Sequence, residues 1–204
     1  MQFWPRFKIF VILFIPIIAI TFVALTSVSA SGSESRHENI ITNEIMQYLK
    51  NNKVRASDEK LKKIATSVYE EAKDNEIDYR LVLAVMKVES NFRSDAISKK
   101  GARGLLQIKP SLAKYVSKET GVSIKSPKCL DEPEKNIRIG VSHLSWLIEK
   151  FENLNTALHA YNVGMGKAKK AVSEDDGPDT RFTRKVLAEY RLIKNTLPHS
   201  HLEQ

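Results

Sequence analysis

The sequence predicts an all-α domain behind a hydrophobic N-terminal leader. Apolar residues recur at helical spacing between Ser57 and Leu197, and capping residues precede several of these runs. The alternating pattern typical of strands is confined to a short β-like loop over residues 94–106. A nearly continuous apolar run, Ile9–Leu25, comes before the helical part. We therefore expect one helical domain and one membrane-targeting segment.

Residues 1–30 are expected to be a signal peptide or a membrane anchor. The 17-residue run Ile9–Leu25 is longer than a typical signal-peptide core of about 7–15 residues and shorter than the roughly 20 that span a bilayer. Small residues at Val28–Ala30 form a cleavage-site pattern, so cleavage and anchoring both stay open. Because the basic flank, Arg6 and Lys8, stays inside, both outcomes predict export to the periplasm or cell envelope, anchored to the inner membrane if uncleaved.

The helical pattern divides the exported chain into segments. Residues 31–56 are expected to form a polar linker and a short amphipathic helix with Ile41, Ile45 and Leu49 on one face. The main domain covers residues 57–197, and residues 198–204 form a polar tail. The residues expected to start or cap its helices are Ser57, Asp78, Pro110, Pro133, Asn155 and Asp179.

The chain is basic, with a net charge of +8. The part beyond the leader contains 30 basic and 24 acidic residues. This balance favours an anionic partner. We expect no nucleic-acid partner, because no basic tract interleaved with aromatic residues and no zinc-finger spacing occurs. The five histidines show no metal-ligand spacing, so no metal or other cofactor is expected. Cys129 is the only cysteine and is expected to be a free thiol.

Glu89 interrupts an apolar helix pattern. It follows Val85 by four residues and Val82 by seven, which predicts that its carboxyl faces inward. Burial would raise its pKa and suit it to donate a proton, whereas nearby cations would lower the pKa. Those cations are Lys87, Arg93, Lys99, Lys100 and Arg103. The pattern does not decide between these effects, and a solvated helix end is the alternative.

A glycine-containing loop follows Glu89. Gly101 and Gly104 allow the backbone to approach a ligand closely, and Gln107 can both donate to and accept from a sugar hydroxyl or N-acetyl group. Leu105 and Leu106 would form a buried wall or an apolar platform. An ordinary connecting loop is the alternative interpretation.

A third polar segment, His159–Gly166, follows an apolar helix pattern. Tyr161 can hydrogen-bond a carboxylic acid, and Asn162 can bind an amide or hydroxyl. A packed tyrosine and a helix-ending asparagine are the alternative. His159 lies two residues from Tyr161 and is expected to point elsewhere, as a packing or surface residue.

Three segments together resemble the lytic transglycosylase catalytic domain of the soluble lytic transglycosylase and goose-type-lysozyme-like family. They are "ESNFRSDAISKKGARGLLQIKPS", "EKNIRIGVSHLSWLIEKF" and "ALHAYNVGMGKA", within roughly Ile77–Ala171. Leu106 stands where the family often has methionine, and His159 where a small residue is common. The resemblance implies a lysozyme-like helical fold.

The resemblance also implies a reaction. Glu89 would protonate the glycosidic oxygen between N-acetylmuramic acid (MurNAc) and N-acetylglucosamine (GlcNAc), then accept the muramyl C6 hydroxyl proton as a 1,6-anhydro ring closes. The family uses one essential carboxylate, and the nearby Asp95 is expected to be a turn or cap residue. Tyr161 would orient Glu89 and, with Asn162, line the substrate site. The other implied substrate-binding residues are Ser90, Gly104, Leu105 and Gln107.

Two other functions stay open at this point. One is a hydrolytic muramidase or chitinase-like enzyme, which would release reducing ends. The other is a non-catalytic peptidoglycan-binding component of a secretion or pilus complex. In each case the expected partner is a peptidoglycan strand, and an uncleaved leader would add a membrane contact.

Overall fold

The structure is a computed structural model that describes residues 34–169 and 178–198. Its two compact units are Met1–Ile40 and Ile41–Gln204. The predicted leader and residues 199–204 of the predicted tail lie outside the described residues. Within the described ranges, no helix has the length and apolar character needed to cross a membrane.

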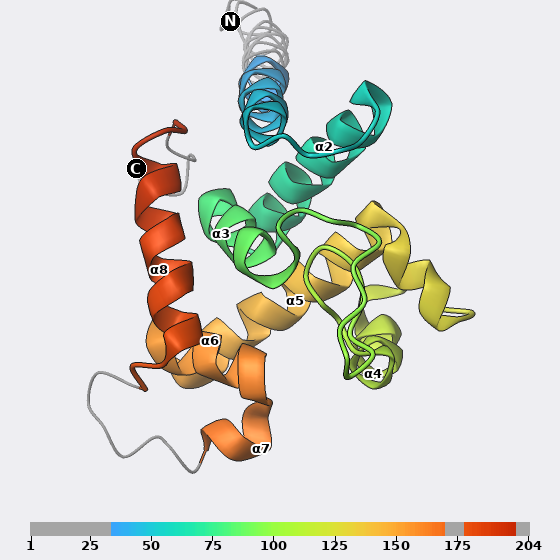
Figure 1. Cartoon of the computed structure of the whole chain (residues 1–204), viewed down its shortest axis with the longest axis vertical. Helices are drawn as coiled ribbons and strands as arrows, with labels where there is room; N and C mark the ends of the chain where they lie inside the picture. Colours follow the sequence, from blue (N-terminus) through green and yellow to red (C-terminus); the bar gives the residue numbers. More distant parts are fainter. Residues whose placement is uncertain (1–33, 170–177, 199–204) are drawn as a thin grey trace, which may run out of the picture. The chain divides into compact units, whose positions relative to one another are not determined.

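The second unit is helical, as the sequence predicts (Figure 1). After residues 41–51, which are helical, its elements are α2 (Asp58–Asp74), α3 (Tyr79–Ser90), α4 (Pro110–Thr120), the 3₁₀ helix η1 (Pro127–Asp131), α5 (Pro133–Phe151), α6 (Leu154–Val163), α7 (Met165–Ala168) and α8 (Arg181–Lys194). The described residues contain no strand. The expected β-like loop is present as two isolated antiparallel bridges, Ile97 to Arg103 and Arg103 to Ile108.

Helix α5 is the centre of this unit, because α2, α4 and α6 all pack against it. Helix α3 packs against α2 and α8. Figure 1 shows the loop after α3 and then α4 on one side of α5, with α6 and α7 towards its other end. The three polar segments singled out in the sequence therefore belong to elements that meet around α5.

Local capping explains where several helices begin. Ser57 accepts a hydrogen bond from the Lys60 amide at 3.3 Å, and Asp78 accepts one from the Arg80 amide at 2.8 Å, as predicted. Helix α6 differs from the prediction. Its cap lies two residues before the expected one, because the Asn153 side chain, not that of Asn155, accepts from the Thr156 amide at 2.9 Å.

The start of α8 also differs from the prediction. The expected first residue, Asp179, precedes the true cap, Thr180. Thr180 and Thr183 bond each other's backbone amides in a reciprocal capping box. Thr183 was not recognised as its partner because a glutamate or glutamine is more usual at that position.

The hydrophobic core begins before Ser57. Ile41, Ile45 and Leu49 are buried in the same core as α2 and α3. The amphipathic face predicted for this short helix is therefore real, and it packs within the compact unit. Residues 34–39, expected as part of a linker, continue the helix.

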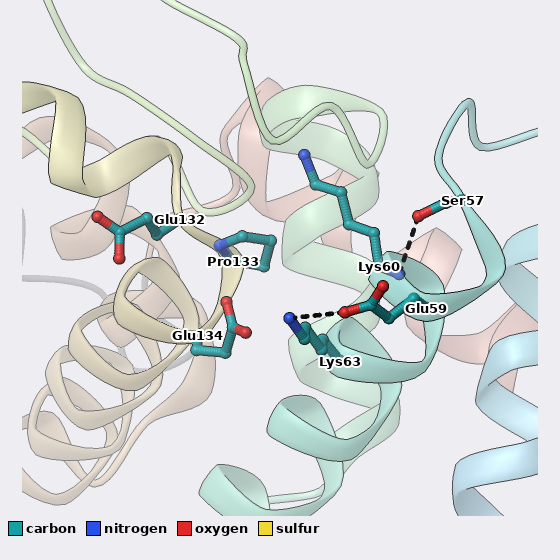
Figure 2. A pocket seen from close by; sticks show the side chains of 7 residues that line it. All are labelled: Ser57, Glu59, Lys60, Lys63, Glu132, Pro133 and Glu134. Carbon is teal, nitrogen blue, oxygen red and sulfur yellow. Dashed lines mark hydrogen bonds and ion pairs between the residues drawn. The ribbon is translucent and has the colours of Figure 1, made fainter.

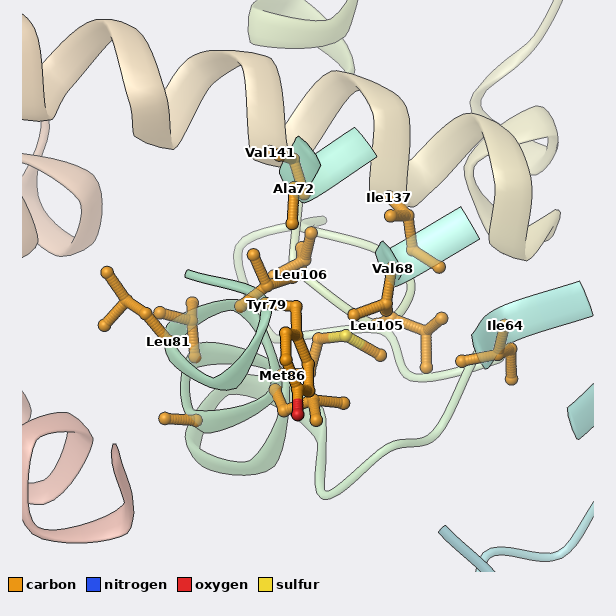
Figure 3. Packing of buried hydrophobic residues seen from close by; sticks show 14 of the residues in the cluster. Ile64, Val68, Ala72, Tyr79, Leu81, Met86, Leu105, Leu106, Ile137 and Val141 are labelled. Atoms are coloured by element: carbon orange, nitrogen blue, oxygen red, sulfur yellow. The ribbon is translucent and has the colours of Figure 1, made fainter. Parts of the chain in front are cut away.

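Two leucines of the loop after α3 enter this core. Leu105 and Leu106 are fully buried, and Figure 3 shows them among side chains of α2, α3 and α5. Burying two leucines contributes on the order of 3–6 kcal/mol relative to leaving them exposed. The loop that carries Gln107 is thus anchored to the core and held beside α3.

A buried ion pair at the start of α3 is linked to α8 by a hydrogen bond. The Arg80 guanidinium is fully buried and bonds both Asp78 carboxylate oxygens, at 2.7 Å for the shortest contact. Tyr190 of α8 donates to the same carboxylate at 2.7 Å. Because each buried charge has a partner, the network avoids the cost of an isolated ion. Its effect is to hold the start of α3, the helix that carries Glu89.

Candidate active site

Glu89 lies one residue before the end of α3, which Asn91 ends in the left-handed conformation. Its side chain is partly buried, and burial raises its pKa from 4.5 to about 7. The inward orientation predicted from Val82 and Val85 is therefore correct. At neutral pH a substantial fraction of this carboxyl is protonated, as a general acid requires.

The neighbouring cations do not offset the burial of Glu89. The Lys87 ammonium donates to the Asn52 side chain at 2.8 Å and lies over the Phe92 ring. Arg103 is engaged by Asp131, with contacts of 2.6 and 2.9 Å. Lys87 and Arg103 are thus directed to other partners, while Arg93, Lys99 and Lys100 are exposed to solvent. Desolvation therefore determines the pKa of Glu89.

The backbone around Glu89 adopts uncommon conformations. Asn91 and Phe92 have φ values of 52° and 61°, and Gln107 has φ of 49°. Positive φ is unfavourable for residues with a Cβ, least so for asparagine. Buried Phe92 is held by packing against Tyr48, with ring centroids 6.1 Å apart. Strain of this kind gathers at sites where precise placement matters.

Ser90 bonds the loop after α3 to the helix that carries Glu89. Its buried hydroxyl lies 2.8 Å from the Leu105 carbonyl and 3.1 Å from the Met86 carbonyl. The single hydroxyl hydrogen is therefore used inside the protein. This placement makes Ser90 a positioning residue for the loop, and its predicted contact with substrate stays a prediction.

Gln107 is suited to bind substrate through its oxygen. Its amide nitrogen donates to the carbonyls of Ala96 and Gly104, at 3.1 and 3.0 Å. These bonds fix the rotation of the carboxamide. Both of its described hydrogen bonds use nitrogen, which leaves Oε1 as an oriented acceptor for a hydroxyl or N–H group.

Gly104 and Leu105 are buried in the loop that carries Gln107. Gly104 is buried, with φ of 77°, and a Cβ there would overlap Asn136 and the Leu130 carbonyl. Leu105 is fully buried. Gly104 and the Leu105 side chain are thus packed inside the protein, and their contact with substrate stays a prediction.

Asn136 of α5 is the structural residue that sequence reasoning missed. It is fully buried, and its Oδ1 accepts from the Leu106 amide at 2.8 Å. Its Nδ2 donates to the carbonyls of Arg103 and Leu130, both at 2.9 Å. The signal was an asparagine beside the apolar stripe of a helix, four residues before Gly140, whose missing Cβ makes room for Leu106.

Tyr161 of α6 completes the attachment of the loop. Its hydroxyl donates to the Leu106 carbonyl at 2.8 Å. Burial, with a smaller contribution from the Glu89 charge, raises the pKa of Tyr161 well above its ordinary value. Tyr161 is therefore neutral, and it is close enough to Glu89 for the Glu89 charge to raise its pKa. Since its hydrogen is committed to Leu106, it can bond Glu89 only by accepting from the protonated carboxyl.

Asn162 and His159 occupy different surroundings. Asn162 is exposed next to Tyr161, where a ligand could reach it. His159 is half-buried, and its Nδ1 has no hydrogen-bond partner among the described residues. The sequence prediction that His159 is a packing residue agrees with this placement.

Two aromatic residues of α5 extend from Tyr161 and were not singled out in the sequence: His143 adjoins Tyr161, and Trp146 adjoins His143. The His143 ring lies 5.8 Å from the Tyr161 ring and stacks on Trp146 at 6.0 Å with an interplanar angle of 17°. Burial lowers the pKa of His143 to about 4, so it is neutral at pH 7. The 41% exposed Trp146 ends this row of rings at the surface.

Replacing Tyr161 with phenylalanine should both slow turnover and destabilise the fold. The change leaves the Leu106 carbonyl without its donor, at a cost of about 1–3 kcal/mol. It also frees the loop that faces Glu89, for which we expect about a 10- to 100-fold loss of rate. Peptidoglycan-cleavage rates and thermal unfolding of both proteins measure these effects.

The matched control for this substitution is Tyr115→Phe. Tyr115 is 65% exposed on α4, so loss of its hydroxyl should alter neither rate nor stability. Equal rates for the Tyr161 and Tyr115 variants would contradict a positioning role for Tyr161.

A separate hollow of about 380 Å³ lies where α2 and α5 begin (Figure 2). Its lining mixes both signs of charge, and Lys63 pairs with Glu59 across 3.1 Å. It shares no residue with the Glu89 site. We therefore assign the candidate active site to the region around Glu89, Gln107 and Tyr161.

The fold and site together define a helical, lysozyme-like domain that holds a partly buried carboxyl with a raised pKa. Residues 66–182, more than half of the chain, match the family described as the Transglycosylase SLT domain. The chain belongs to this family.

Two curated relatives show the same likeness. The chain is 35% identical over 98 residues to the membrane-bound lytic murein transglycosylase F of Haemophilus influenzae (strain PittGG), a match covering 45% of this chain and 18% of that one. It is 33% identical over 104 residues to the soluble lytic murein transglycosylase of Escherichia coli (strain K12), covering 50% and 16%. The matches thus span less than a fifth of each relative.

Solved structures agree with the helical fold. The 70-kDa soluble lytic transglycosylase of Escherichia coli shares the fold with a TM-score of 0.58 at 24% identity, over 78% of this chain and 32% of that one. An inactive glutamate-to-glutamine mutant of the lytic transglycosylase Slt from Pseudomonas aeruginosa gives a TM-score of 0.56 at 28% identity, over 63% and 23%.

Proposed function

We propose that this chain is a peptidoglycan lytic transglycosylase that cleaves the MurNAc-β-1,4-GlcNAc bond and leaves 1,6-anhydro-MurNAc ends. The observation that carries this proposal is Glu89, whose pKa is raised to about 7 by burial. It lies in a site that also contains the oriented Gln107 amide and the neutral Tyr161 hydroxyl. A carboxyl with such a pKa can donate a proton near neutral pH and then accept one.

The reaction needs a single carboxylate acting twice. Protonated Glu89 donates its proton to the glycosidic oxygen as the bond from that oxygen to muramyl C1 breaks, and the GlcNAc side leaves as an alcohol. The C6 hydroxyl oxygen then attacks C1 while Glu89 takes its proton. The 1,6-anhydro ring closes, no water is consumed, and Glu89 is protonated again. The intramolecular hydroxyl acts at high effective concentration.

The surroundings of Glu89 favour this cycle over hydrolysis. A hydrolytic enzyme usually needs a second carboxylate as base or nucleophile. Asp95, the nearest acid in the following loop, is exposed. Burial is the cause of the Glu89 pKa shift, and no other carboxylate contributes to it. We therefore rank the muramidase or chitinase-like alternative second.

The relatives support the same chemistry. Both curated relatives are named lytic murein transglycosylases, and the Slt mutant with glutamine for one glutamate is described as inactive. By analogy, Glu89 is the glutamate to test here. A peptidoglycan substrate places the domain in the cell envelope, either released by leader cleavage or held at the inner membrane. Action within a secretion or pilus complex would use the same site.

Product analysis tests the proposal directly. Purified peptidoglycan digested with the full chain should yield muropeptides with 1,6-anhydro ends, which mass spectrometry distinguishes from hydrolysis products by the loss of one water. Reducing muramyl ends would instead favour a hydrolase. Absence of any cleavage would favour the non-catalytic binding component.

Activity should fall as pH rises above about 7. The acid form of Glu89 is needed in the first step, and its pKa is about 7. The rate should then decrease about tenfold per pH unit on the alkaline side. Initial rates between pH 5 and 9 measure this, with circular dichroism as a check on folding. A rate that stays constant to pH 9 would rule out Glu89 as the acid.

A further inference from the structure

The positive charge of the chain is concentrated in one segment beside the active site. Residues 91–128, here called the basic lobe, comprise the loop after α3, α4 and the connection to η1. They contain nine of the 32 basic residues and two of the 24 acidic ones, a net charge of +7. The whole chain has +8, so the remaining residues are nearly balanced.

Most cations of the basic lobe are exposed and have no ion pair among the described residues. Arg93, Lys99 and Lys100 lie in the loop. Lys109, Lys114 and Lys118 lie at the start of α4 or along it. Lys125 and Lys128 continue this series beyond α4. The ninth cation, Arg103, is the exception, because Asp131 neutralises it at 2.6 Å.

Outside the basic lobe, only some cations of the described chain are left without an ion pair. Several make ion pairs with nearby acids, namely Lys50 with Asp58, Lys63 with Glu59, Arg80 with Asp78, Lys135 with Glu132 and Arg184 with Asp179. Unpaired like charges within a Debye length of about 10 Å at 0.1 M salt repel one another. A surface that keeps eight such cations produces a positive field available to an external anion.

The basic lobe is continuous with the site. Arg93 follows Glu89 by four residues, and Lys109 follows Gln107 by two. Figure 1 shows the loop and α4 on one side of α5, close to the end of α3. A strand that reaches Glu89 is thus bordered by this surface.

We propose that the basic lobe binds the carboxylates of the peptide stems on the glycan strand being cleaved. This inference rests on the proposed function. Stems project from each muramyl residue, so their carboxylates lie beside the strand at positions that vary with crosslinking. Flexible lysines tolerate such variation better than a rigid bidentate site would. Their field also increases the rate of encounter with an anionic strand.

The test compares two charge-matched variants of the full chain in a Glu89→Gln background, which prevents cleavage during binding. One replaces Lys99, Lys100, Lys114 and Lys118 with glutamine. The control replaces four exposed cations outside the basic lobe, which are Lys62, Arg181, Lys185 and Arg191. Co-sedimentation uses intact sacculi and sacculi whose carboxylates are amidated with carbodiimide and ethanolamine.

With intact sacculi at 0.1 M salt, we expect the lobe variant to bind about tenfold more weakly than the control, since exposed ion pairs are individually weak but four of them are lost together. With amidated sacculi the two should bind equally. Equal binding to intact sacculi, or unchanged binding of the control after amidation, would overturn the inference. So would selective loss of binding to phosphatidylglycerol vesicles, which would assign the surface to the membrane.

A second measurement separates this inference from the proposed function. Variants with Glu89 intact are assayed for 1,6-anhydro ends on both kinds of sacculi. The lobe variant should be slower than the control on intact sacculi and equal to it on amidated ones. If neither variant nor the unmodified chain releases anhydro ends, the proposed reaction fails, while the binding comparison still decides the role of the lobe.

Discussion

Glu89→Gln should reduce peptidoglycan cleavage by about 1,000-fold or more. Glutamine keeps the size and polarity of the side chain but cannot transfer a proton, and general acid–base catalysis contributes about 10²–10⁴-fold per step. Here the same carboxyl serves both steps of the cycle. Release of anhydro-muropeptides from sacculi, followed by mass spectrometry, measures the loss.

Asp95→Asn is the matched control for this substitution. Asp95 is the other acid near the site in the sequence, and it is exposed. The Asp95→Asn variant should cleave peptidoglycan at a rate within a factor of about two of the unmodified chain, because most surface substitutions have small effects. A Glu89→Gln enzyme that still cleaves at the rate of the Asp95→Asn enzyme would refute the catalytic assignment.

A stability measurement shows that the Glu89 variant is folded and checks the burial of the carboxyl. The folded-state pKa of about 7 exceeds the ordinary 4.5, so the folded protein holds the Glu89 proton more tightly than the unfolded chain. The resulting stability is fully present below pH 4.5 and is lost as pH rises through 7. Glutamine avoids this loss, so at pH 8 the variant should be more stable by about 3 kcal/mol, with no such gain near pH 4.

The helices were largely predictable because their signals are local. Ser57 and Asp78 cap helices through amides two or three residues away, and the inward position of Glu89 follows from Val82 and Val85. Errors occurred where two capping residues compete, as with Asn153 and Asn155. Propensity places a helix end only to within one or two residues.

The electrostatics of Glu89 could not be predicted, because they depend on distant partners. Lys87 is held by Asn52, 35 residues away, and Arg103 by Asp131, 28 residues away. Spacing in the sequence shows that these cations are near Glu89 along the chain. It does not show which groups these side chains bond. Those partners decide whether desolvation or attraction to the cations has the larger effect on the pKa of Glu89.

The structure explains why three separated polar motifs act together. Ser90 of α3 binds the Leu105 carbonyl, Asn136 of α5 binds the Leu106 amide, and Tyr161 of α6 binds the Leu106 carbonyl. Three helices thus hold consecutive polar groups of one buried loop. Residues that the sequence suggested as substrate contacts, Ser90 among them, set the position of Gln107 relative to Glu89.

Gly104→Ala should destabilise the protein by several kcal/mol, because this loop has no space for a methyl group. A Cβ at Gly104 would overlap the Asn136 side chain and the Leu130 carbonyl. Asn136 cannot move away without breaking its bonds to the loop. Overpacking of this kind costs about 1–3 kcal/mol, in addition to the 1–2 kcal/mol of a left-handed alanine. Urea unfolding measures the total.

Gly101→Ala separates the cost of overpacking from the cost of a left-handed alanine backbone. Gly101 has φ of 75°, close to the 77° of Gly104, but a Cβ there meets nothing within 4 Å. Its substitution should therefore cost only the backbone part, about 1–2 kcal/mol, and leave cleavage nearly unchanged. The Gly104 variant should lose additional stability and, where still folded, activity, because the Leu105–Leu106 segment that carries Gln107 is displaced. Equal destabilisation by the two alanines would mean that the contact between Gly104 and Asn136 does not hold the loop in place.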